Sequence, residues 1–202
     1  YDDLDRIREF ARGVDVVTFE FENVSSEGAR AAAECAVVRP SPGALEIAQH
    51  RIREKTFVGD AGVPVAPFAT IRSDADLEAA ARGVPFPAVL KTATFGYDGK
   101  GQIAVRQSAD LPSAWESLRR SEAILEAFID LDREISVIGA RGVDGSMSHF
   151  GPIENAHANH ILDVSVAPAA VSPSLAAEAV RITGAILEAL QYIGILCIEF
   201  FV

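Results

Sequence analysis

The sequence is poor in cysteine and has no long hydrophobic run. Its two cysteines, Cys35 and Cys197, lie among small and apolar residues and lack the spacing of metal ligands. We therefore expect two buried thiols in a reducing, cytoplasmic environment. No apolar stretch reaches the ~18 residues that a membrane-spanning helix needs, and no stretch resembles a signal peptide. A membrane protein or a disulfide-stabilised protein is therefore not expected.

Positive charge is also scarce. Lysine and arginine together number 18 against 29 aspartates and glutamates, and the formal net charge is −11. Binding to nucleic acid or to an anionic membrane surface is not expected, because both require clustered basic residues. A local basic pocket for a phosphate group is still compatible with this charge, since the field at a site is set by its own residues.

The chain has 202 residues, of which 49% are hydrophobic, and this suffices for one large domain or two small ones. It opens on charged residues and closes inside the apolar run 198–202. Domains rarely begin or end so abruptly, and we expect further sequence at both ends.

Helices and strands alternate in the first part of the chain. The pattern predicts a helix at 4–11, a buried strand at 14–21, a helix from Ser25 or Ser26 to about residue 35, and a strand at 36–38. This order is typical of the tail of an open α/β sheet. Ser41-Pro42 begins a helix that reaches Gly62, either continuous or broken, and the proline-rich segment 62–67 is expected to be a hinge.

The remainder predicts two successive α+β units. The first has a helix capped by Ser73, strands at 87–93 and 102–106, and a helix at 110–120. The second has strands near 123–127, 133–140, 147–153 and 161–166, a helix from Ser172 to about Tyr192 and a last strand that carries Glu199.

The stretch from Val89 to Gln102 carries the strongest chemical signal. An apolar strand ends in Lys91, and a loop with three glycines and a second lysine, Lys100, follows. Glycines let a backbone approach a ligand closely, and N–H groups beside two ammonium groups suit a polyphosphate. The alternatives are a solvated edge-strand lysine and a plain Asp98-Gly99 hairpin turn. We predict a hairpin that covers a nucleotide, although the loop lacks the P-loop pattern.

Three glutamates lie within or beside apolar strands, namely Glu126, Glu134 and Glu199. Carboxylates are rarely buried unless they are paired, so each could instead lie on a solvated face. Glu199, between two apolar residues, suggests a ligand for Mg²⁺, with phosphates of the nucleotide as further ligands. Glu154-Asn155-Ala156-His157 places an acid, an amide and an imidazole on an expected loop, where His157 is either a site residue or a structural histidine.

Six segments, taken in order, resemble the N5-carboxyaminoimidazole ribonucleotide synthase family of ATP-grasp enzymes. They are Thr18–Asn23 (TFEFEN), Gly62–Pro67 (GVPVAP), Gly96–Gln102 (GYDGKGQ), Arg133–Val137 (REISV), Glu154–His157 (ENAH) and Glu199–Val202 (EFFV). The resemblance runs over essentially the whole chain, and the glycine loop together with the ENAH segment is specific within the superfamily.

The resemblance implies an α+β class and an ATP-grasp fold of two α+β lobes, preceded by the tail of a Rossmann-like α/β domain. The implied domains are 1–40 for that tail, 41–125 for linker helices and the small lobe, and 126–202 for a large lobe truncated at its C-terminus. The implied enzyme is a carbon–nitrogen ligase of purine biosynthesis. It uses ATP, Mg²⁺ and bicarbonate to carboxylate 5-aminoimidazole ribonucleotide through carboxyphosphate, as a cytoplasmic homodimer.

The resemblance also implies roles for individual residues. Lys91, Lys100 and His157 would be catalytic, Glu199 would bind the metal, and Tyr97 and Asp98 would approach the imidazole substrate. Glu134 would accept hydrogen bonds from the ribose hydroxyls. The implied ATP-binding set is Arg51, Lys91, Gly96, Tyr97, Asp98, Gly99, Lys100, Gly101, Gln102, Glu126, Ala127, Phe128, Ile129, Glu134 and His157.

This chain departs from the family in three ways. It lacks the glycine-rich turn at the family's N-terminus, it lacks the later Asn-Glu pair with its basic segment, and His50 stands where aspartate usually precedes the arginine. Two alternatives follow. One is another ATP-grasp carboxylase or ligase, such as biotin carboxylase or the formate-dependent glycinamide ribonucleotide transformylase. The other is a nucleotide-binding fragment without catalysis.

Overall fold

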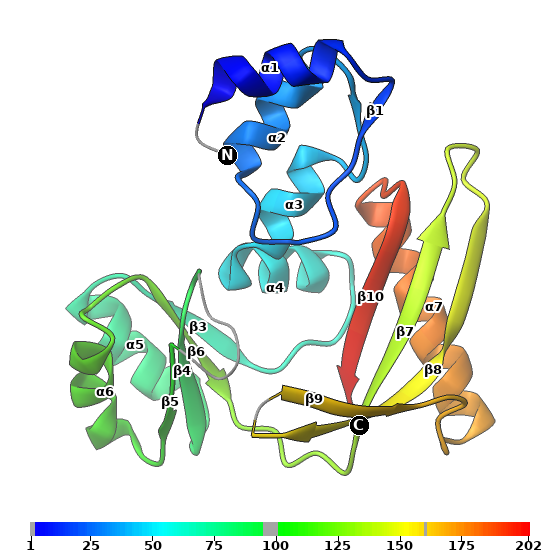
Figure 1. The fold of residues 1–202 in the computed structure, drawn as a ribbon. Helices are drawn as coiled ribbons and strands as arrows, with labels where there is room; N and C mark the ends of the chain where they lie inside the picture. Colours follow the sequence, from blue (N-terminus) through cyan, green and yellow to red (C-terminus); the bar gives the residue numbers. More distant parts are fainter. Residues whose placement is uncertain (1–2, 95–100, 160) are drawn as a thin grey trace. The chain divides into compact units, whose positions relative to one another are not determined.

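A computed structural model describes residues 3–94, 101–159 and 161–202 (Figure 1). The chain divides into two compact units. The first unit comprises Tyr1–Gln49, Glu134–Glu154 and Ser165–Phe200, and the second comprises His50–Arg133, Asn155–Val164 and Phe201–Val202. The domain boundaries expected from the sequence, near residues 40 and 125, stay a prediction.

The N-terminal part of the first unit is a small α/β arrangement. Its elements are α1 (Leu4–Arg12), β1 (Val16–Val17), α2 (Ser26–Ala33), β2 (Val37–Val38) and α3 (Pro42–Ala48). β1 and β2 pair in parallel, and α2 connects them. The side chains of Ser25 and Ser41 accept hydrogen bonds from the first turns of α2 and α3, as expected for N-cap serines. The predicted alternation of helix and strand is confirmed here.

The predicted buried strand at 14–21 is wrong. Only Val16 and Val17 form a strand, and Val16 is 55% exposed. The side-chain amide of Gln49 donates to the carbonyl oxygens of Glu22 and Val24, at 2.5 and 2.6 Å. The partner strand β2 offers only Val37 and Val38 for pairing, so the strand ends at Val17, and the bonds from Gln49 hold the chain further on, at residues 22 and 24.

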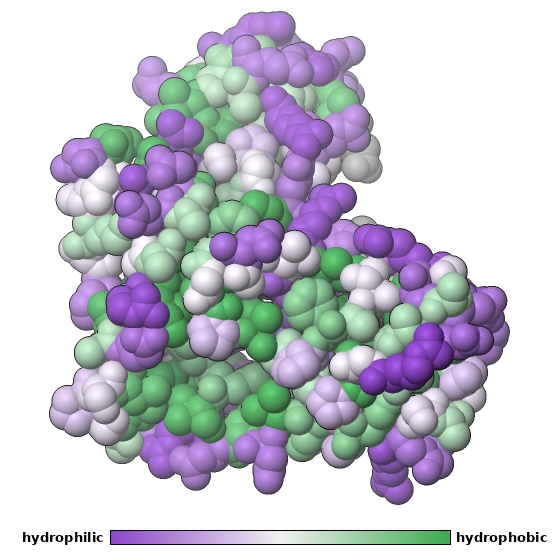
Figure 2. Space-filling view, turned by 180° about the vertical axis from the view of Figure 1, so that it is seen from behind, coloured by the Kyte–Doolittle hydropathy of each residue, from purple (hydrophilic) through white to green (hydrophobic). Residues whose placement is uncertain are grey.

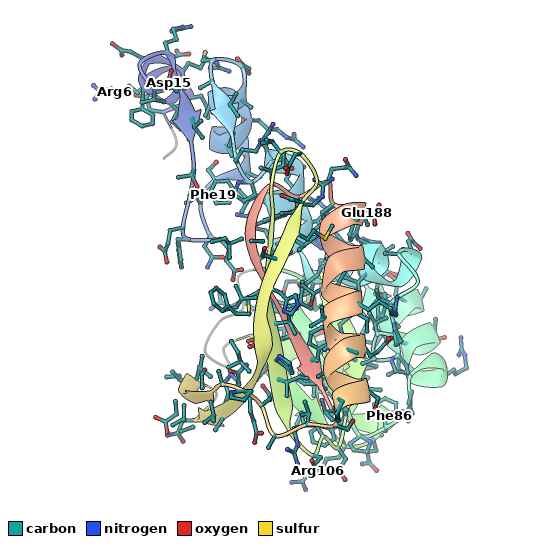
Figure 3. The ribbon with its side chains drawn as sticks, turned by 90° about the vertical axis from the view of Figure 1, so that its right-hand side faces the viewer. Arg6, Asp15, Phe19, Phe86, Arg106 and Glu188 are labelled. Carbon is teal, nitrogen blue, oxygen red and sulfur yellow. The ribbon has the colours of Figure 1, made fainter. Side chains whose placement is uncertain are left out.

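A four-stranded sheet with the strand order β10-β7-β8-β9 follows. The strands are β7 (Glu134–Arg141), β8 (Met147–Ala158), β9 (Ile161–Val166) and β10 (Gly194–Phe201). Helix α7 (Pro173–Ala189) runs along β7, with the exposed Glu188 near its C-terminal end (Figure 3). A Cβ atom on Gly139 of β7 would lie 2.7 Å from Cδ1 of Leu187, so glycine allows this close packing.

Two further sequence expectations are wrong in this region. Glu154–His157 lies inside strand β8 instead of on a loop, because β8, which pairs with β7 and β9, continues beyond the predicted end at residue 153 to Ala158. The cysteines are not both buried: Cys35 is half-buried and Cys197 is exposed. Cys197 lies on the edge strand β10, whose alternate residues, Cys197 and Glu199 among them, are exposed.

The second unit contains a four-stranded antiparallel sheet with the strand order β3-β6-β4-β5. Its elements are α4 (Arg51–Asp60), β3 (Phe68–Ile71), α5 (Asp74–Gly83), β4 (Ala88–Thr92), β5 (Gln102–Val105), the 3₁₀ turn η1 (Ser108–Asp110), α6 (Leu111–Ser117) and β6 (Ala123–Ala127). The predicted helix from residue 41 to Gly62 is broken between α3 and α4, and the predicted strands of this unit are confirmed within two residues.

The two faces of this sheet differ in character. Leu90 and Leu125 point to one face, where they and the fully buried Trp115 are part of the main apolar core. The helices α5 and α6 lie on this face of the sheet (Figure 1). The opposite face carries a smaller cluster in which Ile52 of α4 packs on Ile124. Alternation along the strands thus separates the core face from a face with room for polar side chains.

Within the described ranges, none of the helices combines the length and apolar character that crossing a bilayer requires. The surface drawn in Figure 2 mixes hydrophilic and apolar residues.

Candidate functional site

The lysine that ends the predicted strand lies beside a buried glutamate. Lys91 is on β4 and pairs in register with Ile124 of β6. Side chains alternate along a strand, so Lys91 lies on the same face as Glu126, diagonally across the sheet. Its ammonium group donates to Oε2 of Glu126 at 3.0 Å. The strand pairing therefore determines which carboxylate the lysine meets.

A second lysine reaches the same oxygen from helix α4. Ile52 packs α4 against this face of the sheet, and Lys55 follows one turn later. The ammonium nitrogen of Lys55 lies 3.3 Å from Oε2 of Glu126. One carboxylate thus binds two ammonium groups, one from the sheet and one from the helix.

Hydrogen bonds from Arg51 connect the start of α4 to the end of β4. Its backbone N–H donates to the carbonyl of Ala93 at 2.9 Å, and Nη1 donates to the carbonyl of Thr92 at 2.8 Å. Arg51 and Lys55 are four residues apart, so they lie on one side of the helix. The first turn of α4 is thereby held beside Lys91.

Burial makes these contacts strong. Glu126 is only 5% exposed, whereas the side chains of Lys91 and Lys55 are 22% and 21% exposed. A buried carboxylate requires compensating partners. The three groups together carry a net positive charge, in a chain whose net charge is −11. The arrangement therefore suits an anionic ligand such as a phosphate group.

A second polar group supports the start of α4. Nε2 of His50 lies 3.3 Å from Oε2 of Glu122, and Nε of Arg72 donates to Oε1 of Glu122 at 2.6 Å. Burial would raise the pKa of the Glu122 carboxyl, but hydrogen bonds from Arg72 and His50 outweigh burial and lower it. His50, the residue that replaces the usual aspartate, is thus part of a structural contact at this helix.

Most of the predicted glycine loop lies outside the described residues, namely Gly96, Tyr97, Asp98, Gly99 and Lys100. Its last residues are described. The N–H of Thr92 donates to the carbonyl of Gly101 at 2.9 Å, and Gln102 begins β5. Gly101 has φ +71°, and a Cβ atom there would lie 2.7 Å from Oγ1 of Thr92. The strands form the predicted hairpin, and its closing contact requires glycine.

Residues 126–129 of the implied ATP-binding set lie at the end of β6 and just beyond it. The N–H groups of Ala127 and Phe128 donate to the carbonyls of Pro67 and Pro87, at 2.9 and 3.0 Å. These two amides therefore hold the end of the strand in place. The carboxylate of Glu126 contacts the two lysines.

The other predicted site residues lie elsewhere in the fold. Glu134 is the half-buried first residue of β7, and Glu199 is exposed on β10; both belong to the first unit. His157 is exposed on β8, in the part that belongs to the second unit. In the described part of the chain, no group of three or more His, Cys, Asp or Glu residues is placed to hold a metal ion. The roles of these residues stay predictions.

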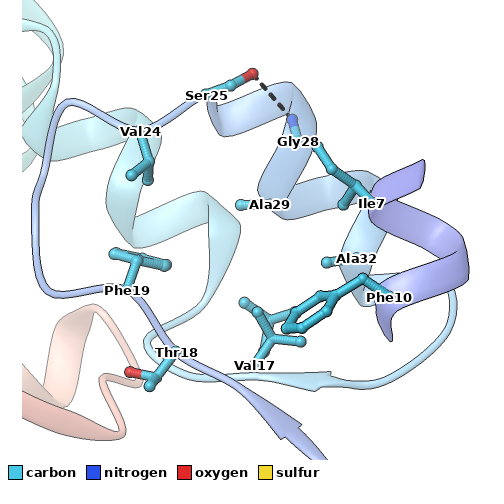
Figure 4. A pocket seen from close by; sticks show the side chains of 11 residues that line it. Ile7, Phe10, Val17, Thr18, Phe19, Val24, Ser25, Gly28, Ala29 and Ala32 are labelled. Atoms are coloured by element: carbon cyan, nitrogen blue, oxygen red, sulfur yellow. Dashed lines mark hydrogen bonds between the residues drawn. The ribbon is translucent and has the colours of Figure 1, made fainter. Parts of the chain in front are cut away.

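An apolar cavity of about 180 Å³ lies in the first unit, between α1, α2 and the segment after β1 (Figure 4). Ile7, Phe10, Val17 and Phe19 contribute to its lining, and Ser25 at its rim caps α2. The lining contains no charged side chain. This cavity is therefore unsuited to a phosphate, unlike the cluster around Glu126.

Family models match nearly the whole chain. The model of the ATP-grasp domain matches residues 56–202. The chain belongs to the ATP-grasp family. The model of the ribonucleotide synthetase preATP-grasp domain matches residues 1–49. The predicted fold, an ATP-grasp domain after a smaller α/β domain, is confirmed by these matches.

Individual proteins agree with the family. This ATP-grasp chain is 40% identical over 204 residues to N5-carboxyaminoimidazole ribonucleotide synthase of Brucella melitensis, matching all of this chain and 56% of that protein. For the synthase of Pseudomonas aeruginosa the identity is 41% over 201 residues, with 55% of that protein matched. A crystal structure of an ADP complex of N5-carboxyaminoimidazole ribonucleotide synthetase superposes with a TM-score of 0.92 and 36% identity, over all of this chain and 53% of that one. The chain spans about half the length of these relatives.

The sequence pattern did not single out Lys55. Two signals could have identified it. The chain has only three lysines, Lys55, Lys91 and Lys100, and the two others lie in or beside the glycine motif. Lys55 also follows Arg51 by one helical turn. The pairing with Glu126 depends on how α4 packs on the sheet, which local patterns do not reveal.

Proposed function

We propose that the protein that contains this chain is an N5-carboxyaminoimidazole ribonucleotide synthase. It would use ATP and bicarbonate to carboxylate the amine of 5-aminoimidazole ribonucleotide, as a ligase of purine biosynthesis. The observation that carries the proposal is similarity over the whole chain to such synthases, at 40% and 41% identity. The basic cluster at the end of β4 supports it, because ATP needs cations at its phosphates.

The chemistry requires an activated form of bicarbonate, which is a poor electrophile. Transfer of the γ-phosphoryl group to bicarbonate gives carboxyphosphate, and its breakdown releases CO₂ beside the substrate amine. Phosphoryl transfer asks a protein mainly for positioning and for neutralisation of charge. We assign that role to Lys91 and Lys100, and we assign Arg51 to a phosphate contact.

Further roles complete the proposal. The segment Gly96–Gln102 would exclude water from carboxyphosphate, and Tyr97 and Asp98 would approach the imidazole. Glu134 would accept hydrogen bonds from the ribose, and His157 would lie near the phosphate or bicarbonate end.

Adenine would be bound by the backbone of residues 126–129. The amides of Ala127 and Phe128 already donate to carbonyl oxygens of the protein. We therefore propose the N–H of Ile129 as the donor to the adenine ring.

Glu199 is proposed as a protein ligand of Mg²⁺. An exposed carboxylate offers the oxygen donor that this hard cation prefers, and phosphate oxygens would be further ligands. Mg²⁺, when bound, neutralises charge on the transferred phosphoryl group. A cytoplasmic location and a homodimer belong to the same proposal.

The test is a substrate-omission experiment on the intact protein. ADP formation is measured with ATP, Mg²⁺, 5-aminoimidazole ribonucleotide and bicarbonate, and then with each of the last two left out. The proposal predicts rapid ADP formation only in the complete mixture. Formation that instead requires formate and glycinamide ribonucleotide would support the transformylase alternative. Nucleotide binding without ADP formation under any of these conditions would support a non-catalytic protein.

A further inference from the structure

We propose that Lys55 is a positioning residue for the phosphate-binding lysine. Its ammonium group neutralises Glu126, so that Lys91 can leave this carboxylate and bind a phosphate of the nucleotide. The inference depends on the proposed function, which assigns Lys91 to the phosphates.

The two lysines compete for a single acceptor atom. Lys91 donates to Oε2 of Glu126 at 3.0 Å, and Lys55 lies 3.3 Å from the same oxygen. Glu126 needs compensation, because it is 5% exposed and has little contact with water. It does not need both lysines, since one ammonium group balances one carboxylate.

The consequence appears when a phosphate binds. In the presence of Lys55, departure of Lys91 leaves Glu126 in a neutral ion pair. In the absence of Lys55, Lys91 is the ammonium group that pairs with Glu126. If Lys91 then left, the buried carboxylate would remain charged and unpaired, which is strongly unfavourable. Lys91 would then stay on Glu126, and the fraction of protein with a free Lys91 would fall. Apparent affinity for a phosphate-bearing ligand falls in proportion to that fraction.

The two lysines that share Glu126 come from different elements of the fold. Lys55 is on α4, which Ile52 packs against the sheet and which Arg51 ties to Thr92 and Ala93. Lys91 is the next-to-last residue of β4, just before the segment that leads into the glycine motif. Helix α4 therefore supplies a second positive charge for Glu126, and the end of β4 supplies the lysine that precedes the glycine motif in the sequence.

The experiment compares ADP with adenosine, which lacks phosphates, as ligands of the intact protein by titration calorimetry or competition. Lys55→Met is expected to weaken ADP binding about tenfold, the effect of trapping some nine-tenths of the molecules in the closed ion pair. Adenosine binding is expected to stay unchanged, because it does not need Lys91. Lys55→Arg should restore most of the ADP affinity. Arg53→Met removes an exposed positive charge from the same helix and is the matched control, with unchanged binding of both ligands.

A second comparison removes the carboxylate that Lys55 is proposed to neutralise. In the Glu126→Gln background, Lys55→Met should change ADP affinity less than about twofold, because there is no longer a charge to neutralise. The comparison of Glu126→Gln with Lys55→Met/Glu126→Gln also tests the inference if Lys55→Met alone does not fold, because the double variant leaves no unpaired buried carboxylate.

The results that would overturn the inference can be told apart from one another. Unchanged ADP binding in Lys55→Met, or an equal loss for ADP and adenosine, overturns the inference. A full loss that persists in the Glu126→Gln background means that Lys55 contacts the phosphate itself, which also overturns it. If the wild-type protein binds no nucleotide, the proposed function fails as well.

Discussion

The ammonium group of Lys91 and the carboxylate of Glu126 form a 3.0 Å ion pair between neighbouring antiparallel strands of one sheet. The glutamate is nearly buried, so the contact is shielded from water on the side of the carboxylate. The lysine that we propose as a phosphate ligand is thus held by Glu126, and a phosphate would have to compete with this carboxylate for it.

Replacing Lys91 by alanine should impair catalysis more than folding. Loss of one preorganised donor to a developing charge costs about 3 kcal/mol of transition-state stabilisation, a fall of roughly a hundredfold in kcat/KM for ATP. Glu126 keeps Lys55 as a partner in this variant. Steady-state kinetics of the intact protein provide the measurement, and a thermal melt checks the fold. Unchanged kcat/KM would exclude a phosphate role for Lys91.

Replacing Gly101 by alanine should destabilise the hairpin of β4 and β5. The backbone at Gly101 has φ +71°, and the new Cβ would lie 2.7 Å from Oγ1 of Thr92. We expect a loss of about 1–3 kcal/mol in the free energy of unfolding. Gly83→Ala is the control, because Gly83 ends helix α5 and a Cβ there meets no atom within 4 Å. Chemical denaturation should show a loss for Gly101→Ala and none for Gly83→Ala; equal effects would contradict the steric argument.

Glu199→Gln should raise the concentration of Mg²⁺ needed for half-maximal activity. The amide is a weaker ligand for a hard cation than the carboxylate. Glu188→Gln removes the same charge from an exposed position on α7 and serves as the control (Figure 3). A magnesium titration that does not distinguish Glu199→Gln from Glu188→Gln would remove Glu199 from the proposed metal site.

Glu122 should contribute to stability at neutral pH and lose that contribution in acid. Burial acts to raise its pKa, but hydrogen bonds from Arg72 and His50 prevail and lower it in the folded state. A lowered folded-state pKa stabilises the protein above the unfolded-state pKa, about 4.3 for glutamate, and the stabilisation disappears as the pH falls through the folded-state value.

The corresponding experiment follows the unfolding free energy of Glu122→Gln and wild type from pH 7 to pH 3. The side chains of Glu122 and Arg72 are 36% and 62% exposed, so solvent screening limits the difference at pH 7 to about 1 kcal/mol. The two curves should converge in acid. The control Glu78→Gln alters an exposed carboxylate on α5 and should have a smaller effect at pH 7. A difference that stays constant over this range would show that the ion pair does not stabilise the fold.

Much of the fold was predictable where local rules and tertiary structure agree. The apolar run of β6 predicts a strand, and Ser73 and Ser172 cap the helices that follow them. The run that ends in Lys91, followed by the glycine motif, indicated the right sheet and its hairpin partner. These features depend on residues adjacent in the sequence, which a pattern can detect.

The sequence predictions that failed concern features set by residues far apart in the sequence. The segment after Val17 resembles a strand, but its partner strand β2 has only two residues, so pairing stops at Val17. The strand predicted to end near residue 153 continues through His157, because β8 pairs with β7 and β9. The contact of Lys55 with Glu126 depends on the packing of a helix on a sheet. Each depends on partners distant in the sequence, which a local pattern does not contain.

The proposed site for the phosphates of ATP lies at the end of β4. The decisive measurement is a crystal structure of the intact protein with a non-hydrolysable ATP analogue. In that complex we expect Nζ of Lys91 within hydrogen-bond distance of a phosphate oxygen, Lys55 still paired with Glu126, and adenine at residues 126–129. A nucleotide bound elsewhere, or Lys91 still paired with Glu126 in the complex, would contradict it.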